Sequence, residues 1–409
     1  MLSKLMPSNA EPRFLFFKQT VPFRSFWFAE LCMDVAAPDS RSIVFSDRES
    51  ADVGPVAFRV GPRYERKTLM SRLLSWLRYF CQATRFAFGV RGKPVIFMVS
   101  QPPFLPLLGY LQKKLLGRPY VIWVDDVYPD AIERKELLKH GSVILRLWRG
   151  FNRVVFAEAA AVITLGPYMK ELVEQYVPRS IPVTVIPTWV DTDFILPVAK
   201  DGNPFAADHG QTTKTTVMYS GNLGLTHDVN SILEAARRLR SRSDLHFMII
   251  GAGPRWSEIA ESIERNGDTN ITLLPLQAES VLPFSLATAD IALVSLETGM
   301  EGISMPSKTY YCMAAGAAIV GICPERSDLA YVIREHDCGA SIAPGDADGL
   351  ARIIDRLSAS PNELARLRRN ARTAAVQTFS RDVNTRTVRE TLMQLAIHTE
   401  AKTCGDRAR

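Results

Sequence analysis

Short apolar runs alternate with longer stretches of helical period along most of the chain. Each run is rich in β-branched residues, and a break of Gly, Pro, Asn or Asp separates it from the helical stretch that follows. Continuous apolar strands between helices are typical of parallel sheets covered on both faces. The pattern predicts an α/β protein with two Rossmann-like parallel sheets of about six strands each. The predicted strands are Phe14–Phe17, Ser42–Phe45, Val95–Val99, Tyr120–Val124, Ala161–Thr164 and Val183–Ile186, then Thr216–Tyr219, His246–Ile250, Ile271–Leu274, Ile291–Ser295, Ala318–Val320 and Ala340–Ile342.

The break between the two halves falls in a polar segment. Residues 197–215 are rich in turn formers and have no strong period, so we expect them to form a linker. They divide the chain into an N-terminal domain, 1–196, and a second domain, 216–380. The pattern is purely helical from residue 361 to about 397. We expect 381–409 to be a helix that crosses back to the N-terminal domain and ends in a frayed tail.

The composition excludes several classes of protein. Hydrophobic residues make up 47% of the 409 residues and charged residues 22%, as in globular proteins, which excludes disordered and fibrous classes. No apolar stretch reaches the roughly 18 residues of a membrane span, and the N-terminus lacks the apolar core of a secretory signal. The six dispersed cysteines favour neither a zinc site nor a disulfide framework. We therefore expect a cytoplasmic protein, soluble or peripheral to a membrane.

The net charge is +6, from 49 Lys and Arg against 43 Asp and Glu. This excess suits an anionic partner such as a nucleotide, a diphosphate, a membrane surface or nucleic acid. Nucleic acid is not the expected partner, because the excess is modest and no recognised binding motif is present.

Residues 69–88 predict an amphipathic helix that could supply membrane contact. Arg78 and Arg85 share one of its faces, and a second basic and aromatic stretch follows at 145–156. Such helices suit an anionic bilayer surface. The alternative is a helix that buries its apolar stripe in the domain core. That stripe consists of Leu69, Leu73, Leu77, Phe80 and Ala83.

Two glycine turns follow predicted strands of the second half. Gly221 and Asn222 come after the first of these strands, and Gly253 after the second. Glycines between a strand and a helix let backbone N–H groups approach a phosphate. Any tight turn recruits glycine, so each turn could equally be structural. Neither fits Gly-x-Gly-x-x-Gly, which argues against a nicotinamide or flavin site.

A lysine stands at a predicted helix start in the second half. Pro306 and Ser307 are typical of a helix N-terminus, and Lys308 follows in the first turn. A cation is unfavourable at that end of the helix dipole unless it shares the site with an anion. Lys308 is therefore a candidate phosphate ligand, or else a solvent-facing lysine.

Two adjacent acids, Asp125 and Asp126, follow a predicted strand of the first half. Open α/β sheets bind ligands at this edge, and the two carboxylates could hydrogen-bond sugar hydroxyls. They could equally serve the next helix, which Asp130 is expected to cap.

Residues 94–379 together resemble a GT-B glycosyltransferase of the family 4 type. The resemblance is closest to a bacterial exopolysaccharide and O-antigen subgroup that includes fucosamine-type transferases. It rests on the order and spacing of VDDVYPDA, VIPTWVDTDFI, YSGNLGLTHDV, IIGAGP, EGISMPSKTYYCMAAG and CGASIAPGDADGLARII. It implies two Rossmann-like domains that face each other across a cleft, the first on the acceptor side and the second binding the nucleotide-sugar.

The resemblance also implies roles for individual residues. Gly221 and Asn222 match the turn that faces the donor diphosphate, and Gly253 matches a turn beside the nucleotide. The remaining matches are Pro275 and Leu276 beside the base, Glu301 on the sugar hydroxyls, and Lys308 in the Pro306-Ser307-Lys308 motif as a phosphate counter-charge. Asp125 and Asp126 fall on the acceptor side.

The sequence departs from the wider family at three places. In the wider family a second glutamate follows eight positions after the one that Glu301 matches, and it usually binds the ribose. In this sequence Thr309 occupies that position. Asn222 and His227 stand in the region of an Arg and a Lys, and the residues after Lys18 lack the expected glycine loop. Ribose recognition and the acceptor site are therefore less sharply defined than the donor site.

The resemblance implies a retaining glycosyltransferase of hexosyl or N-acetylhexosaminyl type. The expected donor is a nucleoside diphosphate sugar, with UDP-sugars favoured, and the expected acceptor is a saccharide, carried on polyprenyl diphosphate at the inner face of the plasma membrane. Fixed amides and a lysine can neutralise the leaving diphosphate, so no metal or other cofactor is expected. Two alternatives stay open: a nucleotide-sugar epimerase of the same architecture, served by Asp125 and Asp126, and a non-catalytic nucleotide-sugar-binding subunit.

Overall fold

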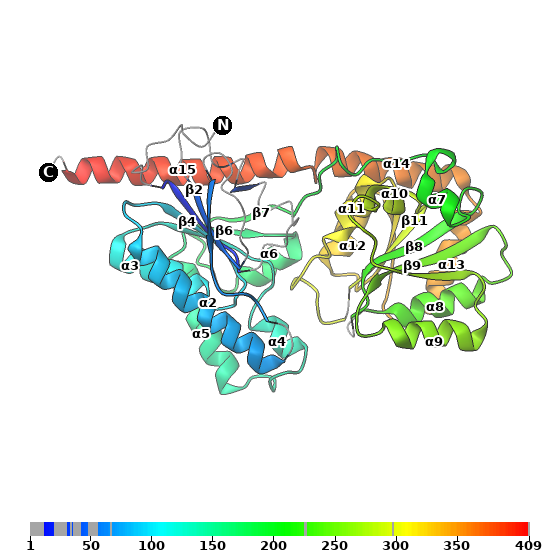
Figure 1. The fold of residues 1–409 in the computed structure, drawn as a ribbon. Helices are drawn as coiled ribbons and strands as arrows, with labels where there is room; N and C mark the ends of the chain where they lie inside the picture. Colours follow the sequence, from blue (N-terminus) through cyan, green and yellow to red (C-terminus); the bar gives the residue numbers. More distant parts are fainter. Residues whose placement is uncertain are drawn as a thin grey trace. The chain divides into compact units, whose positions relative to one another are not determined.

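The chain forms two compact units, Met1–Pro187 with Asp382–Arg409, and Thr188–Arg381 (Figure 1). The structure is a computed structural model that describes residues 12–19, 31–32, 35, 42–47, 56–65, 68–224, 227–296 and 298–407. Over the described residues, no helix is long and apolar enough to cross a membrane.

The first unit is built on a parallel sheet of seven strands in the order β3-β2-β1-β4-β5-β6-β7. Its inner strands are buried along their whole length, as their continuous apolar sequences predict. The strands are β1 (Phe14–Phe17), β2 (Ser42–Ser46), β3 (Val56–Val60), β4 (Val95–Val99), β5 (Tyr120–Trp123), β6 (Ala161–Thr164) and β7 (Val183–Val185). The described helices are α2 (Leu69–Gly89), α3 (Pro106–Leu116), α4 (Asp130–Arg134), α5 (Val143–Ala157) and α6 (Pro167–Val173).

The prediction of six strands in the first half was wrong by one, because it missed β3. This strand lies at the edge of the sheet beside β2 and is exposed over its second half. It therefore lacks the uninterrupted apolar run by which the other strands were identified.

The second unit is built on a parallel sheet of six strands in the order β10-β9-β8-β11-β12-β13. The six predicted strands of this half are all present. They are β8 (Thr215–Asn222), β9 (Leu245–Ala252), β10 (Ile271–Pro275), β11 (Ile291–Ser295), β12 (Ala318–Ile322) and β13 (Gly339–Ile342). The helices are α7 (Pro204–Asp208), α8 (Val229–Arg238), α9 (Trp256–Asn266), α10 (Leu282–Ala287), α11 (Lys308–Ala314), α12 (Asp328–Glu335), α13 (Ala347–Ser358) and α14 (Pro361–Gln377).

The segment expected to be a linker is a folded part of the second unit. It contains the 3-10 turn η1 (Lys200–Gly202) and helix α7. The Lys200 ammonium is paired with Asp290, and the Asn203 side chain donates to the Phe284 carbonyl oxygen at 2.8 Å. These long-range contacts come from single polar side chains, so they leave no periodic signal in the sequence.

The last helix, α15 (Arg381–Arg407), groups from Asp382 onward with the first unit. Val388 and Leu392 are fully buried on its inner face. A short break at residues 378–380 separates it from α14, where the Phe379 carbonyl oxygen accepts a hydrogen bond from the Val190 amide at 3.0 Å.

Candidate functional site

The carboxyl ends of β8 and β9 come unusually close together in the second unit. Both strands run further than the apolar pattern predicted, because Gly221 pairs with Gly251 and Asn222 with Ala252. A Cβ atom on Gly251 would lie 2.0 Å from the Gly221 carbonyl oxygen. The glycine at 251 is thus required for this approach. Gly221 itself has φ +146, a conformation that favours glycine.

Gly253 continues the same arrangement in the turn before α9. It has φ +159, and a Cβ atom there would lie 2.4 Å from the Leu223 carbonyl oxygen. That oxygen accepts a hydrogen bond from the Arg255 amide at 3.2 Å, which ties the two glycine turns together. The two turns therefore form one structural feature at the sheet edge.

Lys308 reaches this feature from the start of α11. Its side chain is partly exposed as a whole, but the ammonium nitrogen is buried and has no hydrogen-bond partner in the described structure. A Cβ atom placed on Gly221 would lie 3.5 Å from this nitrogen. Burial lowers the pKa of Lys308 to about 7. An unsatisfied buried ammonium is costly, so an anion at this point would be bound favourably.

Tyr219 is a residue of this site that the sequence interpretation missed. Its ring centre lies 3.6 Å from the Lys308 ammonium nitrogen, and its hydroxyl donates to the Asn222 carbonyl oxygen at 2.8 Å. Tyr219 thus contacts both the lysine and the turn. The sequence signal for Tyr219 is an aromatic residue two positions before Gly221. Aromatic residues at such positions are also common in strands that bind no ligand.

Glu301 lies in the connection from β11 to α11, which also carries the lysine. It is half-buried, and its carboxylate accepts a hydrogen bond from the Gly299 amide at 3.1 Å. Pro306 and Ser307 precede α11 directly, and Ser307 is exposed. Helix α11 is short, so its dipole is weak and disfavours the cationic Lys308 at its first position only slightly.

Thr309 is fully buried, and its hydroxyl donates to the Pro306 carbonyl oxygen at 2.7 Å. This hydrogen bond stabilises the first turn of α11.

Pro275 and Leu276 lie at the end of β10, beside β9. Pro275 pairs in register with Gly251, and Leu276 is 67% exposed. The structure therefore brings these residues to the sheet edge that carries the glycine turns.

The expectation of metal independence assumed that the second half has no Asp-x-Asp sequence, and this was wrong, because Asp346 and Asp348 form one. Asp346 caps α13 by accepting a hydrogen bond from the Gly349 amide at 2.7 Å, and Asp348 accepts one from the Arg238 guanidinium at 2.5 Å. Both carboxylates thus have structural partners.

Asp125 and Asp126 lie at the carboxyl end of β5 in the first unit. Asp125 accepts from the Trp123 indole at 2.9 Å and pairs with Lys18 at 3.3 Å, and Asp126 accepts from the Gln101 amide. Burial raises the pKa of Asp126 to about 6, and the charge of Asp125 adds to the shift. Asp126 therefore keeps its proton to a higher pH than an exposed aspartic acid would.

The expectation that Asp130 caps α4 was wrong. Asp130 lies inside the helix, where its buried carboxylate pairs with Arg149 at 2.9 Å and accepts from the Tyr176 hydroxyl. The distant arginine binds the carboxylate in preference to the nearby amides, because its hydrogen bond is charge-assisted.

Comparison with known proteins agrees with this architecture. Residues 29–189 match the family described as "Glycosyl transferase 4-like domain", and residues 214–360 match "Glycosyl transferases group 1". A probable glycosyltransferase of Pseudomonas aeruginosa, WbjE, is 28% identical over 302 residues, which is 72% of this chain and 74% of the relative.

Two solved structures share the fold. Sucrose-phosphate synthase of Thermosynechococcus elongatus has a TM-score of 0.75 at 13% identity, over 94% of this chain and 99% of its own. HepE of Anabaena, solved in complex with UDP and glucose, has a TM-score of 0.69 at 17% identity, over 93% of this chain and 99% of its own.

Two parallel-sheet α/β units with C-terminal helices define the class: this is a GT-B fold. The chain is a glycosyltransferase, with a glycosyl transferase 4-like domain followed by a group 1 domain.

Proposed function

We propose that the protein is a retaining glycosyltransferase that uses a nucleoside diphosphate sugar, with UDP-sugars favoured. The observation that carries this proposal is the buried Lys308 ammonium, which has no hydrogen-bond partner in the described structure and lies beside Gly221. A diphosphate there would supply the missing acceptors. HepE, which shares the fold, was solved with UDP and with UDP-glucose.

The reaction would break the anomeric C–O bond and leave a nucleoside diphosphate. Lys308 and the backbone amides of the Gly221 turn would stabilise the developing negative charge without reorganising. Glu301 would accept hydrogen bonds from the donor sugar hydroxyls. In a retaining reaction on one face of the sugar, the leaving phosphate takes the proton of the acceptor hydroxyl, so we assign no separate base.

The acceptor we propose is a saccharide carried on polyprenyl diphosphate, in the synthesis of an exopolysaccharide or O-antigen. One relative supports this role: a putative colanic acid biosynthesis glycosyl transferase, WcaI, of Escherichia coli, is 33% identical over 107 residues, which is 26% of this chain and 26% of the relative. We place Asp125 and Asp126 on the acceptor side. The enzyme would work at the inner face of the plasma membrane. Its substrates would be close in class to those of the fucosamine-type subgroup.

A donor screen tests the proposal. We expect UDP or a UDP-sugar to raise the melting temperature more than GDP, ADP or CMP, because ligands that bind only the native state stabilise it. The stabilising donor should then be consumed only when a lipid-linked saccharide is present. Turnover of the UDP-sugar to another UDP-sugar without acceptor would instead indicate an epimerase. Binding without turnover over a broad panel of acceptors would indicate a non-catalytic subunit.

A further inference from the structure

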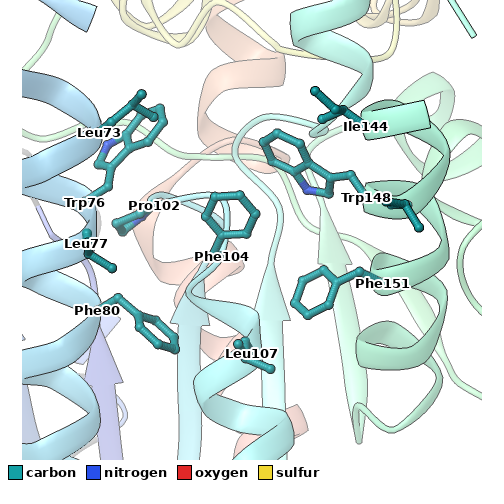
Figure 2. Close-up of a pocket in the computed structure, with 11 residues that line it drawn as sticks. Leu73, Trp76, Leu77, Phe80, Pro102, Phe104, Leu107, Ile144, Trp148 and Phe151 are labelled. Carbon is teal, nitrogen blue, oxygen red and sulfur yellow. The ribbon is translucent and has the colours of Figure 1, made fainter. Parts of the chain in front are cut away.

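The first unit contains an apolar cavity of about 530 Å³ that is separate from the acidic pair. Its two walls are α2 and α5, and its floor is the start of α3 with the loop before it (Figure 2). Every lining side chain is aliphatic, aromatic or proline. Those used below are Trp76, Leu77, Phe104, Leu107, Ile144 and Trp148, and we call this cavity the apolar groove.

Helix α2 exposes the face that lines the groove. The face it buries carries small or hydroxyl-bearing residues spaced four apart, namely Ser75, Tyr79, Ala83 and Ala87. Its large aliphatic side chains are turned away from the core, and Leu77 is 59% exposed. The alternative that this helix buries its leucine stripe in the core is therefore wrong for the described part of the stripe, except at Ala83.

Helix α5 forms the opposite wall in the same way. It buries Leu145, Val155 and Phe156, and leaves Ile144 58% exposed. Exposed apolar surface of this extent on two facing helices is typical of a binding site rather than of ordinary protein surface.

A row of aromatic rings joins the groove to the acceptor side. The Phe104 and Trp148 rings stack at 4.7 Å, and Trp148 in turn stacks on Tyr128 at 6.3 Å. Asp126 and Tyr128 together line a smaller pocket beyond these rings. The groove thus begins beside the carboxylates proposed to bind the acceptor sugar.

The two walls carry charge of one sign. Helices α2 and α5 contain no Asp or Glu and carry six arginines, of which Arg149 is paired with Asp130 and Glu133 from the neighbouring α4. These arginines are Arg72, Arg78, Arg85, Arg146, Arg149 and Arg153. A ligand that fits both features has a hydrocarbon chain and an anionic head.

We propose that the apolar groove binds the polyisoprenyl chain of the acceptor lipid, next to its diphosphate. This inference rests on the proposed function for the identity of the lipid. A branched, flexible hydrocarbon chain can follow a concave surface lined by aromatic and aliphatic side chains and needs no polar partner there. A flat bilayer surface would contact the residues on the outer, convex side of the helices as much as the residues that line the groove. Arg72, which lies 5.6 Å from the Trp76 ring on the groove wall, is placed to meet the diphosphate.

The test measures binding to the full-length protein without turnover. The probes are farnesyl diphosphate and inorganic diphosphate, titrated calorimetrically below the micelle concentration of the lipid. Leu77→Gln and Ile144→Gln introduce a polar side chain into the groove. Their matched controls are Leu74→Gln and Val154→Gln, exposed apolar residues on the same helices that do not line it.

We expect farnesyl diphosphate to bind at least about ten-fold more tightly than inorganic diphosphate, given the size of an apolar side-chain contact. The two groove variants should each lose most of that difference, and the two controls should keep it. Equal affinity for the two probes would overturn the proposal. Equal losses in the groove variants and their controls would also overturn it, because the lipid would then contact the exposed apolar surface of the helices in general.

A kinetic arm separates this inference from the proposed function. If transfer occurs with the same KM for acceptors with and without the isoprenyl chain, the enzyme is a glycosyltransferase but the groove proposal fails. If the groove variants abolish farnesyl diphosphate binding while no nucleotide-sugar is bound or consumed by the wild type, the groove proposal stands and the proposed function fails.

Discussion

The Lys308 ammonium lies 3.6 Å from the centre of the Tyr219 ring and has no hydrogen-bond partner in the described structure. The ring attracts the cation through its electron-rich face, but it satisfies none of the three N–H donors. The Tyr219 ring therefore holds the Lys308 side chain in place, and the unsatisfied N–H donors of the lysine favour the binding of an anion.

Lys308→Ala should lower turnover of the preferred donor by ten-fold or more. A charge-assisted hydrogen bond to phosphate contributes about 1.5–3 kcal/mol, which corresponds to a factor of this size. The control is Lys214→Ala, a lysine just before the opposite end of β8. Unchanged kinetics for Lys308→Ala, or equal losses in both variants, would remove Lys308 from the site.

Tyr219→Leu should weaken nucleotide binding more than Tyr219→Phe, because phenylalanine keeps the ring that holds the lysine. A desolvated cation–π contact contributes about 2 kcal/mol. Calorimetry of UDP binding measures the difference. In a Lys308→Met background the two Tyr219 variants should bind UDP equally. A difference that persists there would mean that Tyr219 acts through the fold alone.

Binding of the donor diphosphate should take up a proton above pH 7. Burial lowers the pKa of Lys308 to about 7 in the free protein, from 10.5 in water, and a bound phosphate would raise it again. Affinity should therefore fall as pH rises above 7. Calorimetry in two buffers of different ionisation enthalpy counts the protons, and Lys308→Met should abolish the uptake. Proton-neutral binding at pH 8 would contradict the prediction.

The same pKa has a consequence for stability in the absence of ligand. Between pH 7 and 10.5 the unfolded chain binds more protons at this lysine than the native protein, so the destabilisation by Lys308 declines as pH rises through that window. Comparing the pH dependence of unfolding for the wild type and Lys308→Met isolates this contribution.

Glu301→Gln should spare nucleoside diphosphate binding and impair transfer. The amide keeps the size of the side chain but loses the charged acceptor that would bind the sugar hydroxyls. UDP affinity and turnover are measured on the same preparation, with the exposed Glu325→Gln as the control. If UDP affinity falls as far as turnover does, Glu301 does not contact the sugar.

Replacing Arg78 and Arg85 together by glutamate should release the protein from anionic liposomes without unfolding it. Both side chains are exposed on α2, and exposed charges contribute little to stability. Wild-type binding should weaken with salt, because such charges are screened over about 10 Å at 0.1 M. The control reverses Arg240 and Arg334 in the second unit. Binding that is equal for neutral and anionic vesicles, or equal in both double variants, would contradict an electrostatic attachment.

The sequence predicted most of the fold because parallel strands that are buried on both faces must be continuously apolar. Strands such as Ile291–Ser295 were therefore predicted with their observed bounds. The edge strand β3 was missed because only its first residues are buried. The predicted ends of β8 and β9 came too early, because glycine in a sequence usually indicates a turn. In this structure the absence of a side chain instead allows Gly221 and Gly251 to pair.

The candidate site was predictable in part for the same reason. The glycine turns and Lys308 have local signals, and the order of the strands brings their surroundings to one edge of the sheet. Tyr219 has only the weak signal of an aromatic residue before Gly221, and the stretches 69–88 and 145–156 do not by themselves show that they face one cavity. Both features depend on contacts between segments far apart in the chain. Leu77 and Ile144 face one cavity only because α2 and α5 both pack beside α3.

The return of α15 to the first unit determines the order in which the protein can be completed on the ribosome. Residues up to Pro187 emerge first, but their unit also needs Asp382–Arg409. The intervening residues, Thr188–Arg381, take on the order of ten to forty seconds to synthesise at about 5–20 residues per second. During that interval the surface that later covers Val388 and Leu392 stays open to water, while the contiguous second unit can already fold.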